Sequence, residues 1–262
     1  MIVRSSSVAM FKTCPKKAYY AYVRGLYREG TESIDISFGK LVHDAVDIYH
    51  KTGDIRDALS FIDNTQLPSN HKRKTPAAAK ALLNYYYKHY RGVKPIESET
   101  VLLDGRELAF NIGHHEWRLR VDSIVQWRER LWVGENKTTR KEYILLRPND
   151  QFISYYIAVK LHDSQLSGLV VFCFDVESLT VQPFFLIPSQ EECNMWLEET
   201  KVLLDTIEHY VETGIFPKNP SACLQYVGRP CPFLCLCQAP ANEEYLIEQY
   251  FSVDNAAKEL AW

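Results

Sequence analysis

Two acidic residues and a lysine in the middle of the sequence could serve phosphoryl chemistry. Asp122 lies in one segment that alternates apolar and polar residues, and Glu135 and Lys137 lie in the next. Residues 117–127 carry this period-two pattern, which predicts a β-strand, and we expect a second strand over residues 131–138, after the polar turn at 128–130. A hairpin would place Asp122 and Glu135 on neighbouring strands. Lys137, two residues beyond Glu135, would share its face.

This triad suits the hydrolysis of a phosphodiester. Two carboxylates supply the hard oxygen ligands that Mg²⁺ or Mn²⁺ requires. Such an ion polarises a phosphoryl oxygen and lowers the pKa of a bound water, while a nearby ammonium supports the attacking water or the developing charge. The residues therefore favour a metal-dependent phosphodiesterase.

The arrangement resembles the PD-(D/E)XK nuclease superfamily, in which Glu-x-Lys forms the second half of the motif. More narrowly it is similar to the RecB-like branch, which includes the AddB nuclease domain and the CRISPR-adaptation exonucleases. The resemblance implies that Asp122 and Glu135 bind the metal and that Asn136 lends its backbone carbonyl. It also implies that Lys137 positions or deprotonates the water. Relatives commonly have Gly-x-x-Asp, and here Leu119 stands in place of that glycine.

A helix expected over residues 151–161 carries two further candidates. Gln151 and Tyr155 are four residues apart and would lie one above the other on one helical face. The resemblance implies that both face the cleft; alone, they would suit an ordinary amphipathic helix. Arg140 and Lys141 follow the triad and are candidates for DNA contacts, with solvated surface as the alternative.

An upstream helix, expected over residues 38–49, supplies a candidate imidazole ligand. Gly39-x-x-x-His43 resembles a family element whose histidine binds one catalytic ion, which would also make Mn²⁺ a good activator. The alternative is an ordinary hydrogen-bonded helix residue. Glu99, in a strand expected over residues 97–103, is a further candidate near the metal, with solvent exposure as its alternative.

Four cysteines fall close together near the carboxyl end: Cys223, Cys231, Cys235 and Cys237. Thiolates crowded in a loop usually hold a metal or a cluster, and zinc is the usual metal for such a segment. The sequence has no Cys-x-x-Cys knuckle there. A second cysteine motif, Cys14-Pro15, lies at the expected junction of two helical pieces near the amino end.

These cysteines resemble the cluster-binding ends of RecB-like nucleases. The resemblance implies a [4Fe-4S] cluster held by Cys14, Cys223, Cys231 and Cys237, with Cys235 able to replace Cys237. Such a cluster would have a structural role. It would join the two ends of the chain and close a loop of about two hundred residues, which removes much conformational entropy from the unfolded chain.

Composition limits the remaining classes of protein. The chain of 262 residues is 46% hydrophobic, enough for one sizeable core, and its net charge of −3 argues against a protein that coats nucleic acid by bulk attraction. The longest apolar run, around residues 169–174, is too short to cross a bilayer, and no signal peptide or nucleotide-binding P-loop is evident. We expect a cytoplasmic protein that does not associate with a membrane. If the protein is viral, we expect it in the cytoplasm of the host.

The resemblance implies an α/β fold with a restriction-endonuclease-like core. A mixed central sheet flanked by helices would carry a helical insertion and a C-terminal cluster-binding segment. We expect a single nuclease domain over residues 1–262. It would comprise a helical part at 30–95, the catalytic sheet and helix at 96–188, and a helix and cysteine-rich closure at 189–240.

The expected function is that of a metal-dependent DNA nuclease. Exonuclease action on single strands or duplex ends is favoured, in recombination, repair or CRISPR adaptation of a phage or prokaryote, with proteins of those processes as partners. One alternative is a non-catalytic DNA-binding or scaffolding module with a structural cluster. Another is a zinc-binding interaction module.

Overall fold

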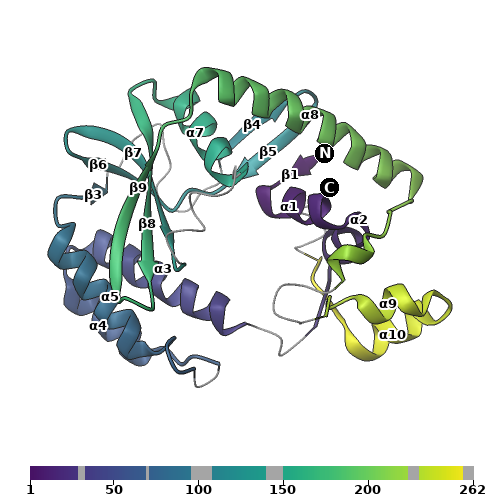
Figure 1. Cartoon of the computed structure of the whole chain (residues 1–262), viewed down its shortest axis with the longest axis horizontal. Helices are drawn as coiled ribbons and strands as arrows, with labels where there is room; N and C mark the ends of the chain where they lie inside the picture. Colours follow the sequence, from purple (N-terminus) through teal and green to yellow (C-terminus); the bar gives the residue numbers. More distant parts are fainter. Residues whose placement is uncertain (29–32, 69–70, 96–107, 140–149, 224–229, 256–262) are drawn as a thin grey trace. The chain divides into compact units, whose positions relative to one another are not determined.

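The computed structural model describes residues 1–28, 33–68, 71–95, 108–139, 150–223 and 230–255 (Figure 1). The chain forms two compact units. The first unit comprises Met1–Thr31, Ala109–Leu119 and Glu191–Trp262, and the second comprises Glu32–Leu108 and Arg120–Gln190.

The second unit is built on a five-stranded mixed sheet. Its strands, in spatial order, are β3 (Lys94–Pro95), β6 (Ser123–Trp127), β7 (Arg130–Lys137), β8 (Leu166–Asp175) and β9 (Thr180–Leu186). β7 and β8 run parallel, and the other neighbours are antiparallel. The connection between the parallel strands carries α7 (Asp150–His162), because parallel neighbours need a crossover.

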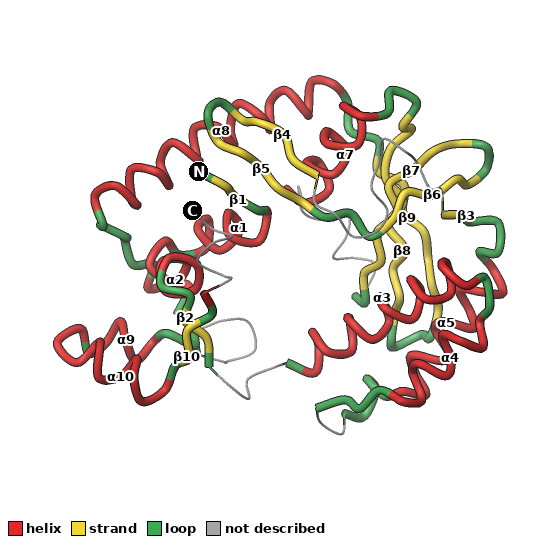
Figure 2. The backbone as a smooth tube through the Cα atoms, turned by 180° about the vertical axis from the view of Figure 1, so that it is seen from behind, coloured by secondary structure: helices red, strands yellow, loops and turns green. Residues whose placement is uncertain are grey.

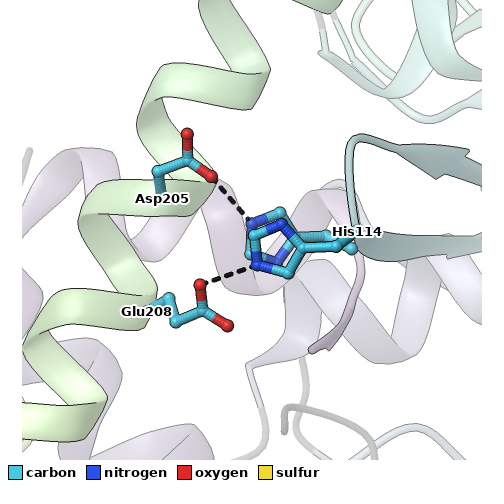
Figure 3. Close-up of side chains that lie close together, drawn as sticks. His114, Asp205 and Glu208 are labelled. Carbon is cyan, nitrogen blue, oxygen red and sulfur yellow. Dashed lines mark hydrogen bonds and ion pairs between the residues drawn. The ribbon is translucent and has the colours of Figure 1, made fainter.

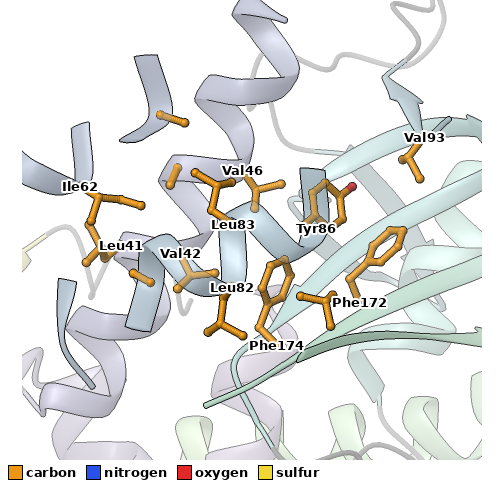
Figure 4. Packing of buried hydrophobic residues seen from close by; sticks show 14 of the residues in the cluster. Leu41, Val42, Val46, Ile62, Leu82, Leu83, Tyr86, Val93, Phe172 and Phe174 are labelled. Atoms are coloured by element: carbon orange, nitrogen blue, oxygen red, sulfur yellow. The ribbon is translucent and has the colours of Figure 1, made fainter. Parts of the chain in front are cut away.

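Three helices cover one face of this sheet: α3 (Ile34–Thr52), α4 (Ile55–Asn64) and α5 (Pro76–His89). α5 begins after Thr75, whose side chain caps the helix by accepting a hydrogen bond from the Ala78 amide. Tyr86 of α5 packs on Phe172 and Phe174 of β8, with ring centroids 5.1 and 5.7 Å away (Figure 4). The main core of this unit lies between these helices and the sheet.

The opposite face of the sheet carries α7, which packs against β7 and β8. Val171 and Cys173 of β8 alternate with the residues that face α5, so they point to this opposite face. The parallel register pairs them with Glu135 and Lys137 of β7. Glu135 and Lys137 therefore face α7.

The strand expected over residues 117–127 is wrong in its extent. Residues 117–127 form two strands, β5 (His115–Leu119) and β6, which belong to different sheets. Asp122 lies in the link directly before β6, although the alternation of apolar and polar residues continues through that link. β6 and β7 form the expected antiparallel hairpin, with Ser123 opposite Gly134, so Asp122 comes next to Glu135 in register.

Gly168 in β8 allows a close approach of the neighbouring strand. A Cβ atom at this position would lie 2.5 Å from the backbone oxygen of Leu186. We expect Gly168→Ala to lower the free energy of unfolding by about 1–3 kcal/mol, because overpacking a strand pair forces backbone shifts. Urea unfolding followed by circular dichroism measures this. Gly92→Ala, where nothing lies within 4 Å of the added atom, is the matched control. Equal midpoints for the two variants would contradict the expectation.

The first unit contains a three-stranded sheet with the order β1 (Ile2–Val3), β5, β4 (Leu108–Ile112). The long helix α8 (Gln190–Thr213) lies beside β4 and β5 (Figure 2). Trp196 of α8 contacts Trp117 of β5 edge-on, with ring centroids 5.1 Å apart.

The ends of the chain meet within the first unit. Tyr20 donates a hydrogen bond to Glu243 at 2.8 Å, and Arg24 donates to Glu244 at 3.1 Å. The segments involved are α1 (Ser5–Thr13), α2 (Pro15–Ala18), a π-helical turn (Tyr19–Val23), the paired strands β2 (Leu26–Tyr27) and β10 (Ser252–Val253), α9 (Leu234–Gln238), α10 (Glu243–Tyr250), and two 3₁₀ turns (Pro220–Ala222 and Pro240–Asn242).

The observed architecture confirms the expected α/β fold with mixed sheets flanked by helices. The strand expected over residues 97–103 lies outside the described residues. None of the described helices is both long enough and apolar enough to cross a membrane.

Candidate active site

The second unit brings His43 and Asp122 together. Nδ1 of His43 lies 3.1 Å from Oδ2 of Asp122, and the backbone amide of Asn136 donates to the same oxygen at 3.0 Å. Gly39, one helical turn before His43, lies against the end of β7: a Cβ atom there would lie 3.1 Å from the Thr138 hydroxyl. The glycine therefore lets α3 place its histidine beside the aspartate.

Burial and charge oppose each other in this pair. Burial raises the pKa of Asp122, but the hydrogen bond and charge of His43 outweigh it and hold the pKa below its ordinary value. For His43, burial lowers the pKa, but the hydrogen bond and charge of Asp122 outweigh it and raise the pKa. The pair thus favours a protonated imidazole, which must lose its proton before it can bind a metal.

Glu135 is buried, with a side-chain exposure of 1%. Its Oε1 accepts hydrogen bonds from Lys137 at 2.5 Å and from Gln151 at 3.2 Å. Its Oε2 is buried and has no hydrogen-bond partner among the described residues. Burial and the charge of Asp122 raise the pKa of Glu135 to about 7. One oxygen is thus held by the protein while the other is left for another ligand.

Gln151 and Tyr155 of α7 complete this network. Gln151 accepts a hydrogen bond from Lys137 at 3.0 Å through its carbonyl and donates to the Tyr155 hydroxyl at 2.7 Å through its amide. Burial and the charge of Glu135 raise the pKa of Tyr155, so its hydroxyl stays protonated. The predicted spacing of four residues therefore places both side chains on the face that meets Glu135 and Lys137.

The donor set fits a divalent cation of the Mg²⁺ or Mn²⁺ class. Two carboxylates and an imidazole converge, and the unpartnered oxygen of Glu135 is a buried polar atom that an ion would satisfy. Ligand atoms of His43, Asp122 and Glu135 do not all lie within 4.8 Å of one another. An ion shared by the three would therefore draw the Glu135 carboxylate towards the His43–Asp122 pair.

The raised pKa of Glu135 predicts how the metal-free protein responds to pH. Because the pKa is about 7 in the fold against an ordinary 4.5, the folded state holds an extra proton between these values, and stability falls as pH rises through this window. The loss is on the order of 1.4 kcal/mol per pH unit. Glu135→Gln cannot lose this proton. In chelator, its unfolding temperature should exceed that of the wild type increasingly from pH 4.5 to 7; parallel curves would contradict this.

Some predicted site residues cannot be placed. Arg140, Lys141 and Glu99 lie outside the described residues. Just before that gap, the backbone oxygen of Thr139 accepts a hydrogen bond from the Cys173 thiol at 2.8 Å.

The four cysteines of the expected cluster all lie in the first unit. The amide of Cys231 donates to the Cys223 carbonyl at 2.8 Å. Burial raises the pKa of Cys231 and of Cys237, and the negative charges of Cys14 and Cys223 add to the increase in both. Cys14 and Cys223 therefore lie close enough to Cys231 and Cys237 to influence the ionisation of those two thiols. Cys235 instead accepts a hydrogen bond from Arg28 at 3.2 Å.

Sequence reasoning missed a second group of polar side chains, in the first unit. His114, Asp205 and Glu208 point towards one another, and His115 joins them (Figure 3). The available signal was a pair of adjacent histidines and, in a predicted helix, two acids three residues apart.

Comparisons with known proteins concern the family and the fold of this chain. Residues 5–238 match the family described as the PD-(D/E)XK nuclease superfamily. The structure is similar to that of a candidate exonuclease from Eubacterium rectale, with a TM-score of 0.50, 10% identity, and coverage of 89% of this chain and 91% of that one. This identity supports a shared fold alone. Similarity to the protein SSO0001 is weaker, with a TM-score of 0.35, 12% identity and coverage of 78% and 76%, and supports no inference. No protein of curated function matches the sequence.

Proposed function

The chain belongs to the PD-(D/E)XK nuclease superfamily, whose substrate is DNA, and we propose that it is a divalent-metal-dependent exonuclease of the RecB-like branch. The observation that carries the catalytic part of this proposal is the buried Glu135 carboxylate. One of its oxygens is fixed by Lys137 and Gln151, and the other has no partner within the described residues. Burial and the charge of Asp122 keep the pKa of Glu135 raised despite the Lys137 ammonium at 2.5 Å, and a divalent cation would favour the ionised carboxylate.

The ion would be held by His43, Asp122 and Glu135, with the backbone carbonyl of Asn136 as a further ligand. When bound, it would supply Lewis acidity towards a phosphoryl oxygen and lower the pKa of a water ligand. The Asn136 amide fixes Asp122 through its hydrogen bond.

Three side chains would act on the water and the scissile phosphate. Lys137 would orient the attacking water or stabilise the developing charge with its ammonium group. Gln151 positions that group, because its carbonyl accepts from Lys137 while its amide holds Glu135. Tyr155 holds the Gln151 amide in turn. Arg140 and Lys141 follow β7 in sequence and would contact the DNA backbone.

End dependence tests the exonuclease proposal. End-labelled linear DNA, single-stranded and duplex, should be degraded with Mn²⁺ or Mg²⁺, whereas covalently closed circles of the same sequences should survive. Asp122→Asn serves as the inactive control. Cutting of circles as fast as linear DNA would overturn the exonuclease assignment, and no cutting of any substrate would favour a non-catalytic DNA-binding module.

We also propose a [4Fe-4S] cluster on Cys14, Cys223, Cys231 and Cys237. The influence of Cys14 and Cys223 on the pKa values of Cys231 and Cys237 supports this set. Because direct contacts already join the two ends of the chain, the cluster would reinforce an existing junction.

Serine substitutions distinguish the two candidates for the fourth ligand. Cys237→Ser should abolish the brown colour and the visible absorption of the cluster, because it removes one of the four thiolate ligands. Cys235→Ser should retain them, because Cys235 is engaged by Arg28. Anaerobic purification with iron and sulfide analysis measures both. Colourless wild-type protein containing zinc would contradict the cluster and favour a zinc-binding module.

The biological setting would be recombination, repair or CRISPR adaptation in the cytoplasm of a prokaryote or phage host, with proteins of those processes as partners. Both units would form one nuclease domain, since the family match from residue 5 to 238 includes segments of each.

A further inference from the structure

A second group of potential metal ligands lies in the first unit, at the turn between β4 and β5. Gly113 adopts the left-handed region with φ 62°, which a two-residue hairpin turn favours at this position. The turn presents His114 and His115 side by side, with ring centroids 3.9 Å apart. Asp205 and Glu208, three residues apart on α8, face them from one side of the helix (Figure 3).

The four side chains pair closely. Nε2 of His114 lies 2.8 Å from Glu208, and Nε2 of His115 lies 3.1 Å from Asp205. One ligand atom from each of the four residues lies within 4.8 Å of the others. The group therefore offers two imidazole nitrogens and two carboxylate oxygens to a single point.

The charge of the group suits a divalent cation. Asp205 and Glu208 are partly exposed carboxylates, and such groups are ionised at neutral pH. Two carboxylates and two neutral imidazoles would neutralise an ion of charge +2. In the absence of an ion, the same pairs are hydrogen bonds of an ordinary kind, which is the alternative to be tested.

His115 is the buried member of the group. Its side chain is fully buried, and Nε2 faces Asp205. Nδ1, on the other edge of the ring, has no hydrogen-bond partner in the described part of the chain. Coordination of a metal at Nε2 would leave Nδ1 as the protonated nitrogen of a neutral ring.

We propose that His114, His115, Asp205 and Glu208 form a structural zinc site. Zn²⁺ accepts imidazole nitrogens and carboxylate oxygens in a tetrahedral group of four, whereas Mg²⁺ prefers oxygen ligands and a larger coordination number. Ligands about 2.1 Å from a tetrahedral ion are about 3.4 Å from one another. The observed pairs at 2.8 and 3.1 Å need to separate only slightly to admit it.

Four protein ligands leave no open position for a substrate, so the ion would fasten the β4–β5 turn to α8. The proposal is independent of the nuclease site, whose residues lie in the other unit.

Zinc stoichiometry tests the proposal in the full-length protein without a polyhistidine tag. Zn²⁺ is titrated against a chromophoric chelator, so that any zinc bound by cysteines or by the nuclease site contributes equally to every variant. His114→Asn and Glu208→Gln should each bind one equivalent fewer than the wild type. His209→Asn and Glu212→Gln, on exposed positions of α8, are the matched controls and should retain the full number.

Thermal unfolding supplies the second readout. Added Zn²⁺ should raise the unfolding temperature of the wild type and both controls more than that of His114→Asn. The side chain of His114 is 61% exposed, so its substitution should leave the fold intact in chelator, as circular dichroism would verify. Equal zinc stoichiometry and equal stabilisation in His114→Asn and His209→Asn would overturn the proposal and leave two hydrogen-bonded pairs.

Discussion

Glu135→Gln should reduce DNA cleavage by about a thousandfold or more while leaving the protein folded. Glutamine keeps the size of the side chain but removes the charge that the cation requires. Loss of about 4 kcal/mol of transition-state stabilisation, within the range expected for a catalytic metal ion, corresponds to about a thousandfold in rate. The measurement is the initial rate on end-labelled duplex DNA at saturating Mn²⁺.

The matched control is Glu129→Gln, at the exposed turn that begins the same strand. It should cleave at the wild-type rate. If Glu135→Gln also retained that rate, Glu135 would have no place in the reaction. If high Mn²⁺ restored the activity of Glu135→Gln, the residue would contribute to affinity for the ion more than to the chemical step.

The second large effect is expected for Lys137→Met. Methionine preserves much of the apolar stem but removes the ammonium group that lies 2.5 Å from Glu135 and 3.0 Å from Gln151. Removal of one donor that stabilises developing charge costs about 10²–10³ in kcat. Because Lys137 is not itself a proposed metal ligand, Mn²⁺ binding should persist. Single-turnover rates and Mn²⁺ titration of the same preparation separate the two properties.

Lys88→Met, at an exposed position on α5, controls for loss of a lysine and should have no effect on either property. A Lys137→Met protein that cleaves normally would show that the ammonium has only a structural role. One that has lost Mn²⁺ binding together with cleavage would show that Lys137 maintains the arrangement of the carboxylates.

The hairpin and α7 could be predicted from the sequence because their signals are local. The apolar residues that follow the polar turn at 128–130 predicted β7, and the spacing of Gln151 and Tyr155 predicted their shared face. The start of α5, where Thr75 caps the helix and Pro76 follows, is a local signal of the same kind. Each depends on neighbours within a few positions of the chain.

The position of Asp122 shows where local pattern fails. Alternation continues from 117 to 127, yet the chain leaves one sheet after Leu119 and enters another at Ser123. Sheet membership depends on pairing with distant strands, which periodicity does not encode. The parallel pairing of β7 with β8, which sets the face of Glu135, is non-local in the same way.

The local sequence pattern also could not predict how burial changes the pKa values of the site residues. Glu135 and Lys137 could be recognised as a motif, but the raised pKa of Glu135 depends on its burial and on the charge of Asp122. Likewise, His114 and Glu208 are ninety-four positions apart, so only the folded first unit brings them together. The family resemblance identified Glu135 and Lys137 as candidates, and the structure supplied their electrostatics.

The most direct test of the central claim is the location of Mn²⁺ in crystals of the protein, from its anomalous scattering. We expect a peak within coordination distance of His43, Asp122 and Glu135, and its absence in crystals of Glu135→Gln. A peak bound to other residues alone, or full occupancy in Glu135→Gln, would contradict the assignment of these three side chains as the ligands of the catalytic ion.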